Sequence, residues 1–92
     1  MSERIHATTV AIRGRGVALL GASGSGKSDL ALRLIDRGAV LVSDDYTEIG
    51  AIDGVVMAKA PRTIAGLIEV RGVGIVTVPH LDNVEIALAV QL

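Results

Sequence analysis

Apolar positions along the chain change from strand-like to helix-like spacing and back, which predicts the order of its first elements. Residues 5–12 (IHATTVAI) are rich in β-branched residues, and residues 17–21 (VALLG) form a second apolar run after a glycine-rich break. The two runs predict a hairpin, or at least two neighbouring strands. Residues 27–37 then follow helical spacing, and Gly38 stands where a left-handed C-terminal cap belongs. The apolar stripe of this helix consists of Leu30, Ala31, Leu34 and Ile35.

The second half of the chain predicts further strands, separated by turn-forming residues. Residues 39–45 (AVLVSDD) are predicted to form a buried strand that ends in two acids. Asp53-Gly54 is a hairpin turn signal, and Pro61 ends the element that follows it. This order predicts an α/β fold with a mixed sheet, one principal helix and several hairpins. The other predicted elements are strands on both sides of the turn within residues 46–60, a helical turn at 62–67 and a last strand at 84–92.

Length and composition predict a single domain over residues 1–92. Half of the residues are hydrophobic, but there is no Phe or Trp and only one Tyr, so Val, Ile, Leu and Ala must fill the core. Such a composition suits a buried sheet covered by helices. The chain has no Cys and therefore no disulfide, which agrees with a reducing cytosol.

Charge and hydropathy argue against several classes of partner. The formal net charge of −1 disfavours broad electrostatic binding to nucleic acid or to an anionic membrane. The apolar runs are too short to span a bilayer, and residues 1–9 lack a hydrophobic signal region. No zinc site or Ser-His-Asp set is recognisable. We therefore expect a soluble, cytoplasmic protein with no nucleic-acid or membrane partner.

Residues 21–28 (GASGSGKS) match the phosphate-binding pattern G-x-x-x-x-G-K-[ST] without a mismatch. Its glycines allow positive φ values, so that main-chain N–H groups and the following helix N-terminus can cradle a β-phosphate. Lys27 would bridge the β- and γ-phosphates, and the Ser28 hydroxyl would coordinate Mg²⁺. The alternative is a glycine-rich turn capped by Ser28. The predicted phosphate-binding residues are Gly21, Ala22, Ser23, Gly24, Ser25, Gly26, Lys27 and Ser28.

Asp44 and Asp45 end the strand that we expect beside this loop. Ligands of open α/β sheets collect at the carboxyl ends of strands. Adjacent side chains of a strand point to opposite faces, so the two acids would have different roles. One could orient and deprotonate an attacking hydroxyl, while the other holds metal or positions a neighbour. The alternative is a solvated acidic turn.

Residues 69–76 (EVRGVGIV) contain two further candidates. Glu69 is a hard oxygen donor suited to Mg²⁺, and Arg71 could stabilise the charge of a phosphate during transfer. The alternative is a glycine-kinked edge strand with an exposed Glu and Arg. Taken alone, His6 and His80 are most simply surface or core residues.

Four segments together resemble the catalytic domain of HPr kinase/phosphorylase, in particular its short alphaproteobacterial form. They are residues 5–12, 21–32, 37–45 and 67–78, and the similarity extends from about Ile5 to Leu92. The resemblance implies a P-loop domain similar to the nucleotide-binding core of phosphoenolpyruvate carboxykinase. It also implies phosphorylation by ATP of a serine on the phosphocarrier protein HPr, in regulation of the phosphotransferase system. Many members reverse this by phosphorolysis, in which inorganic phosphate yields pyrophosphate, and they commonly form hexamers.

The same resemblance assigns roles to individual residues. It implies that Asp44 accepts the proton of the substrate serine and donates it in the reverse reaction, with Asp45 in a supporting role. His6 matches an active-site histidine, and residues 69–78 match a segment associated with both directions of the reaction. The family's catalytic domain continues past the position of Leu92, so we expect a C-terminally truncated form. The remaining implied roles are Lys27 as catalytic lysine, and Ser28 and Glu69 as Mg²⁺ ligands.

These observations lead to the hypothesis of in-line phosphoryl transfer from Mg·ATP to a serine hydroxyl of HPr. Two alternatives remain open at this point. One is a P-loop phosphotransferase that acts on a small molecule. The other is a non-catalytic nucleotide-binding protein with a regulatory role.

Overall fold

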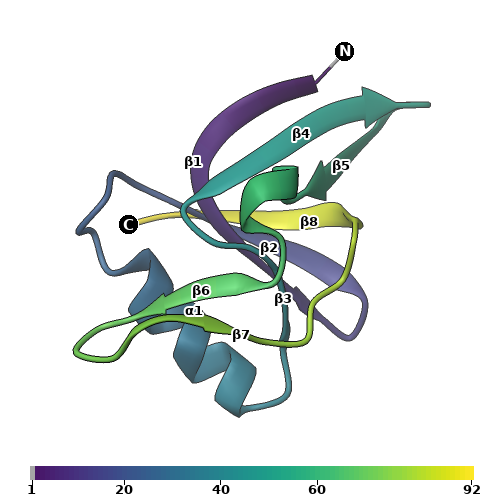
Figure 1. Cartoon of the computed structure of the whole chain (residues 1–92). Coiled ribbons are helices and arrows are strands. Elements are labelled where there is room, and N and C mark those ends of the chain that lie inside the picture. Colours follow the sequence, from purple (N-terminus) through teal and green to yellow (C-terminus); the bar gives the residue numbers. More distant parts are fainter. Residues whose placement is uncertain (1) are drawn as a thin grey trace.

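The computed structural model describes residues 2–92, which form one α-helix, one short 3₁₀ helix and eight strands (Figure 1). The order of elements agrees with the predicted α/β class. Within these residues no helix is long and apolar enough to cross a membrane. The elements are β1 (Ser2–Ile12), β2 (Arg15–Leu20), α1 (Lys27–Asp36), β3 (Val40–Ser43), β4 (Tyr46–Ile52), β5 (Val55–Lys59), η1 (Arg62–Ile64), β6 (Leu67–Val70), β7 (Gly74–Thr77) and β8 (Val84–Gln91).

Six of the strands form a sheet whose pairing closes on itself. The order is β2-β8-β5-β4-β1-β3, and β1 also pairs with β2. The long, curved β1 allows this, because its first half pairs with β4 and its second half with β2 and β3. Only β2 and β8 pair in parallel, so the sheet is mixed, as predicted. Strands β6 and β7 form a separate antiparallel hairpin.

The local predictions for hairpins and helix are confirmed. Strands β4 and β5 are joined by Asp53 and Gly54, with φ values of 52° and 80°, as a two-residue hairpin turn with left-handed residues requires. Helix α1 is followed by Gly38 at φ 108°, whose N–H donates to the carbonyl of Ile35. The single helical turn after Pro61 is η1.

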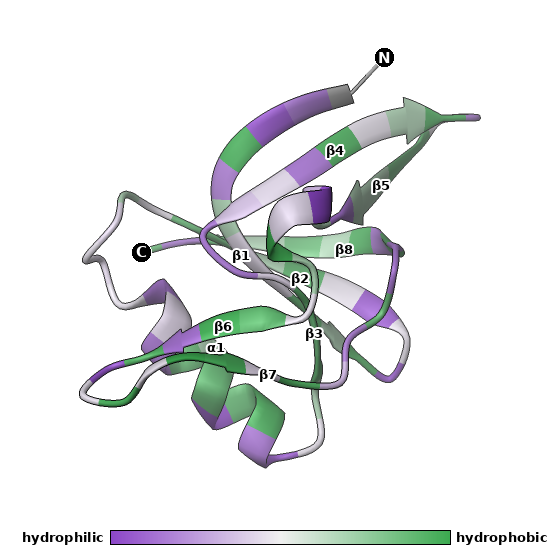
Figure 2. Ribbon diagram, viewed as in Figure 1, coloured by the Kyte–Doolittle hydropathy of each residue, from purple (hydrophilic) through white to green (hydrophobic). Residues whose placement is uncertain are grey.

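The sheet has apolar residues on both faces. On one face, α1 and the β6–β7 hairpin cover β1, β2 and β3. On the other, the curled β4, β5 and β8 pack over β1 and β3. Figure 2 shows the contrast between the apolar β6 and β7 and the hydrophilic start of β1. The buried apolar residues are Val10, Leu19, Ala31, Ala39, Leu41 and Ile68 in the first cluster, and Ala11, Val42, Ala58 and Val84 in the second.

Strands β3 and β4 run along the same edge of β1, with an interruption at Asp44 and Asp45. On one side of the interruption Thr9 pairs with Ser43, and on the other side His6 pairs with Tyr46. The two pairs fit the same antiparallel register. Asp45 has φ 66°, in the left-handed region. The two acids therefore follow strand β3 instead of belonging to it. The alternation of strand side chains, from which we expected opposite faces, does not apply to them.

Candidate functional site

The loop of residues 21–26 joins β2 to the start of α1. Ser25 folds over the beginning of the loop, since its N–H donates to the carbonyl of Ala22 at 3.1 Å. A Cβ atom at Gly21 would lie 2.6 Å from the Ser25 hydroxyl oxygen, so a side chain at this position would force Ser25 to move. Gly24 and Gly26 have φ values of 87° and 94° and face open space. Gly24 and Gly26 therefore adopt the positive φ values expected of these glycines.

Lys27, the first residue of α1, is buried with 3% of its side chain exposed. Its ammonium donates to the carbonyl of Ala22 at 2.9 Å and pairs with Oδ1 of Asp45 at 3.2 Å. A buried ammonium requires such partners, because an unpaired charge away from water is costly. Lys27 therefore lies between the loop backbone and one of the two predicted acids.

Asp44 is also buried, with 7% of the residue exposed, and both of its carboxylate oxygens accept hydrogen bonds. Oδ1 accepts from the Ser28 hydroxyl at 2.6 Å and from the Thr8 hydroxyl at 3.1 Å. Oδ2 accepts from the main-chain N–H of Glu69 at 3.0 Å. This carboxylate joins α1, β1 and β6.

Asp45 has a different environment. Its side chain is 38% exposed, and Oδ1 accepts a hydrogen bond of 3.4 Å from Ser23 in addition to the contact with Lys27. Its main-chain N–H donates to the hydroxyl of Thr8 at 3.0 Å, and its carbonyl accepts from the N–H of Ala7. Asp45 is thus the more accessible of the two acids, and it lies at the loop lysine.

Glu69 and Arg71 come from the β6–β7 hairpin, which lies against the start of α1. Both line a small cavity of about 60 Å³. The Arg71 guanidinium is 3.6 Å from Oδ2 of Asp29, and both side chains are exposed. The other residues of the cavity wall are Gly24, Gly26, Lys27, Ser28 and Asp29. The structure therefore brings the loop and the predicted residues of the hairpin to one place.

The two histidines have different surroundings. The His6 ring lies on the Tyr46 ring, with centroids 4.4 Å apart, and the His6 carbonyl accepts from the N–H of Gly21 at 3.4 Å. His6 is therefore tied to the beginning of the loop. His80 lies between β7 and β8, where its Nε2 is 3.6 Å from Asp82, and takes no part in the contacts described above.

Sequence reasoning missed Thr8, which contacts both acids. It belongs to the β-branched run that predicts β1. From the sequence of such a run, a threonine that only packs in the core cannot be distinguished from a threonine that binds a carboxylate. The contact with Asp44 joins residues 36 positions apart, and no local pattern reports it.

Comparison with known proteins places this arrangement in a family. The family model for the HPr serine kinase C-terminal domain matches residues 1–88. The chain belongs to this family. The HPr kinase/phosphorylase of Clostridium acetobutylicum is 45% identical over 86 residues, and that of Clostridium tetani 41% over 88 residues. These matches cover 94% and 96% of the chain, but the chain spans only 28% and 29% of the length of these relatives.

A solved structure supports the same relationship. The Hpr(Ser) kinase/phosphatase of Coxiella burnetii is similar with a TM-score of 0.87 and 30% sequence identity. The similarity covers 97% of this chain and 58% of that chain. The α/β fold with a mixed sheet is therefore that of the HPr kinase C-terminal domain.

The small cavity at the loop carries oxygen donors from Ser28 and Glu69. Among residues 2–92, no three His, Asp or Glu side chains cluster closely enough to hold a metal by themselves. Mg²⁺ usually binds through one or two carboxylates, substrate phosphates and water, so a full protein cage is not required. A hydroxyl and a carboxylate are donor types that this ion accepts, so Ser28 and Glu69, both on the cavity wall, fit it.

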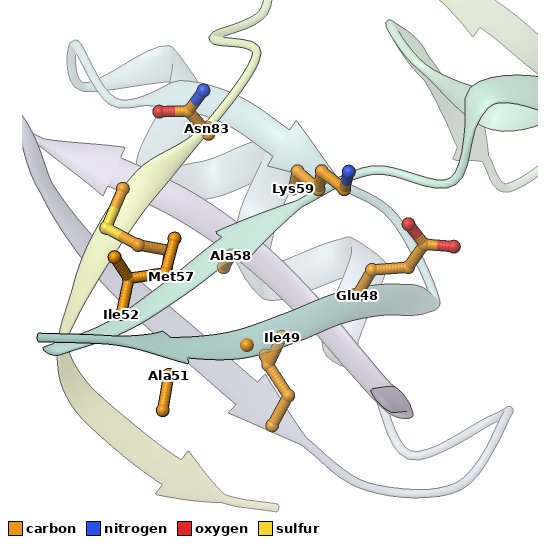
Figure 3. A pocket seen from close by; sticks show the side chains of 9 residues that line it. Glu48, Ile49, Ala51, Ile52, Met57, Ala58, Lys59 and Asn83 are labelled. Atoms are coloured by element: carbon orange, nitrogen blue, oxygen red, sulfur yellow. The ribbon is translucent and has the colours of Figure 1, made fainter. Parts of the chain in front are cut away.

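A larger hollow of about 540 Å³ lies along β4 and β5 of this kinase-family domain (Figure 3). It contains none of the predicted site residues. Gly50, which has no side chain, pairs with Met57 on its wall, and Glu48 and Lys59 lie opposite each other on the same two strands. The residues that the sequence predicts to bind phosphate lie instead at the smaller cavity by the loop. The lining residues are Glu48, Ile49, Gly50, Ala51, Ile52, Met57, Ala58, Lys59 and Asn83.

Proposed function

We propose that this chain carries the nucleotide site for ATP-dependent phosphorylation of a serine on HPr. One observation carries the proposal. Lys27 and Ser28, the first two residues of α1, contact the consecutive acids Asp45 and Asp44 at 3.2 and 2.6 Å. A phosphate-binding loop next to two carboxylates is what phosphoryl transfer to a hydroxyl requires. We also propose that the fold is of the P-loop type, similar to the nucleotide-binding core of phosphoenolpyruvate carboxykinase.

In this proposal the loop holds the phosphates of ATP. The main-chain N–H groups of residues 21–26 and the N-terminus of α1 bind phosphate oxygens, and Lys27 exchanges the Ala22 carbonyl for the β- and γ-phosphates. Arg71, on the wall of the same cavity, adds a positive charge. Ser28 and Glu69 are the proposed Mg²⁺ ligands. When bound, Mg²⁺ would neutralise negative charge on the phosphate oxygens.

The surroundings of the two acids favour roles opposite to those expected from the resemblance. Asp44 is buried, and both of its carboxylate oxygens accept hydrogen bonds. This suits a residue that orients Ser28, one of the proposed Mg²⁺ ligands. Asp45 is exposed enough to meet a partner protein and lies at Lys27. We therefore propose Asp45 as the group that orients the substrate serine and accepts its proton. In phosphorolysis Asp45 would return that proton, while inorganic phosphate takes the phosphoryl group and yields pyrophosphate.

His6 is proposed as a further residue of the active site. Its support is the ring contact with Tyr46, which directly follows Asp45, and the tie of its carbonyl to Gly21. The hexameric assembly, the reverse reaction and the cytoplasmic location remain predictions.

The decisive experiment combines nucleotide binding with a search for phosphoserine. The chain is incubated with Mg·ATP and purified HPr, and mass spectrometry identifies the modified residue. The proposal expects nucleotide binding and phosphate on a serine of HPr. Binding without any transfer would overturn the catalytic proposal and leave a nucleotide-binding role. Transfer to a component of a metabolite pool, with HPr unmodified, would identify a small-molecule phosphotransferase instead.

A further inference from the structure

We propose that Thr8 is a positioning residue that sets the geometry of both carboxylates through one buried hydroxyl. The inference rests on the phosphoryl-transfer function proposed above. Thr8 lies on β1 and contacts Asp44 and Asp45, but it does not line the cavity at the loop. It would therefore act through the acids and not on the substrate.

The register of the sheet explains why a hydroxyl is needed at this position. Ser43, the last residue of β3, pairs with Thr9, and Tyr46, the first residue of β4, pairs with His6. Thr8 therefore lies opposite Asp44, at the point where the ladder is interrupted. The left-handed conformation of Asp45 takes its N–H out of the regular ladder. The Thr8 hydroxyl accepts this N–H at 3.0 Å and so replaces the missing main-chain acceptor.

The direction of the hydrogen bonds follows from the groups involved. A main-chain N–H can only donate, so the Thr8 oxygen must be the acceptor from Asp45. The single hydroxyl proton is then available for Oδ1 of Asp44, at 3.1 Å. One side chain thus holds the backbone of one acid and the carboxylate of the other. The orientation of Asp44 in turn fixes the oxygen to which Ser28 donates.

Loss of this hydroxyl should affect chemistry more than nucleotide binding. Thr8 is fully buried, so its removal leaves the N–H of Asp45 without its partner and Asp44 with one donor fewer. The loop backbone and Lys27 hold phosphate in the proposed function, and the side-chain hydrogen bonds of Thr8 go to the two acids instead. A displacement of the acids by a fraction of an ångström would therefore slow transfer while affinity for the nucleotide remains.

Thr9 provides a matched control at the next position of the same strand. It is also fully buried, and its hydroxyl pairs with that of Thr47 at 2.9 Å. The Thr47 hydroxyl also contacts the carbonyl of Ala7, and these side-chain hydrogen bonds of Thr9 and Thr47 do not involve either acid. Thr9→Val and Thr8→Val therefore both remove a buried hydroxyl and keep the shape of the side chain. Only Thr8→Val removes a contact with the acids.

The test compares Thr8→Val, Thr8→Ser and Thr9→Val in transfer to HPr and in affinity for Mg·ATP. For Thr8→Val we expect kcat to fall about 10- to 100-fold with nucleotide affinity within about twofold, as for misplaced catalytic groups. Thr8→Ser keeps the hydroxyl and should retain kcat within about threefold of the parent chain. Thr9→Val should lose thermal stability to a similar extent but retain kcat. Equal kcat losses in Thr8→Val and Thr9→Val would overturn the inference.

A second measurement is independent of activity. Amide hydrogen exchange, followed by NMR, reports whether the N–H of Asp45 is protected. It should exchange faster in Thr8→Val than in the parent chain, and remain protected in Thr8→Ser and Thr9→Val. If the parent chain fails to phosphorylate HPr, the proposed function fails, whereas unchanged Asp45 exchange in Thr8→Val overturns the positioning role. Should Thr8→Val not fold, Thr8→Ala serves in its place with the same expected results.

Discussion

The hydroxyl of Ser28 donates a hydrogen bond of 2.6 Å to Oδ1 of Asp44, which joins the first turn of α1 to the segment between β3 and β4. The neighbouring pair, Lys27 and Asp45, makes a parallel connection at 3.2 Å. The start of α1 and the two acids are therefore in direct contact. In the proposed function the residues of the two contacts differ in role: some bind the nucleotide and others act in phosphoryl transfer. Substitutions can separate these roles.

Lys27→Met should weaken nucleotide binding without unfolding the chain. Methionine fills a similar volume, and Asp45, which loses its partner, is exposed enough to be hydrated. A charge-assisted hydrogen bond to phosphate would be lost, so the dissociation constant for Mg·ATP should rise about 10- to 100-fold. Calorimetric titration measures the affinity, and circular dichroism on heating serves as the control for folding. Unchanged affinity in a folded variant would show that the loop lysine does not bind phosphate.

Asp45→Asn and Asp44→Asn should impair different steps. Asp45→Asn removes the proposed proton acceptor, so kcat should fall about 10²- to 10⁴-fold while affinity for Mg·ATP changes little. Asp44→Asn instead replaces one carboxylate oxygen with an NH₂ group that cannot accept a hydrogen bond. It therefore breaks either the contact with the N–H of Glu69 or the contacts with Ser28 and Thr8. It should raise the Mg²⁺ concentration required for half-maximal nucleotide binding.

For both variants, mass spectrometry of HPr measures phosphoryl transfer. Titration with nucleotide at several Mg²⁺ concentrations measures the affinity and its dependence on Mg²⁺. If Asp44→Asn abolished transfer with binding intact, and Asp45→Asn transferred at a near-normal rate, Asp44 would be the proton acceptor. The roles first expected from the resemblance would then hold.

Much of the fold could be predicted because its signals are local. The hairpin turn at Asp53-Gly54 and the glycine after α1 act within a few residues, and both are where the pattern indicated. The closing of the sheet depends on β1 pairing with three other strands and on the parallel pairing of β2 with β8. These contacts join distant segments, and apolar periodicity reports which residues are buried but not which strand lies beside which.

The same distinction holds for the site. The phosphate-binding loop is one continuous motif, and the prediction of two acids nearby needed only the order of loop, helix and strand. Asp44 and Asp45 differ in burial and in hydrogen-bond partners. This difference depends on the left-handed backbone of Asp45 and on the hydroxyl of Thr8. Both features occur where the ladder with β1 is interrupted, and the sequence of β3 alone does not reveal this interruption.

Ile68→Val tests how the β6–β7 hairpin is held against the body of the domain. Ile68 is fully buried in the cluster with Leu41 and Ala31, next to Glu69, whose N–H donates to Asp44. Loss of one buried methylene group should lower the free energy of unfolding by about 0.5–1.5 kcal/mol. Ile75→Val on the same hairpin is the control, because Ile75 is 70% exposed and should change stability by less than about 0.5 kcal/mol. Urea unfolding measures both, and equal effects would contradict the packing described for β6.

Arg71→Gln should weaken nucleotide binding but leave stability almost unchanged. The contact of Arg71 with Asp29 is 3.6 Å long and exposed, and pairs of this kind contribute little to folding. Arg71 also lines the cavity at the loop, so loss of its charge should raise the dissociation constant for Mg·ATP about two- to fivefold. The difference should shrink at high ionic strength, because salt screens exposed charges. Arg4→Gln, which breaks the ion pair with Glu48 on β1 and β4, is the control and should leave affinity unchanged. Equal affinities for the two variants at low salt would remove Arg71 from the nucleotide site.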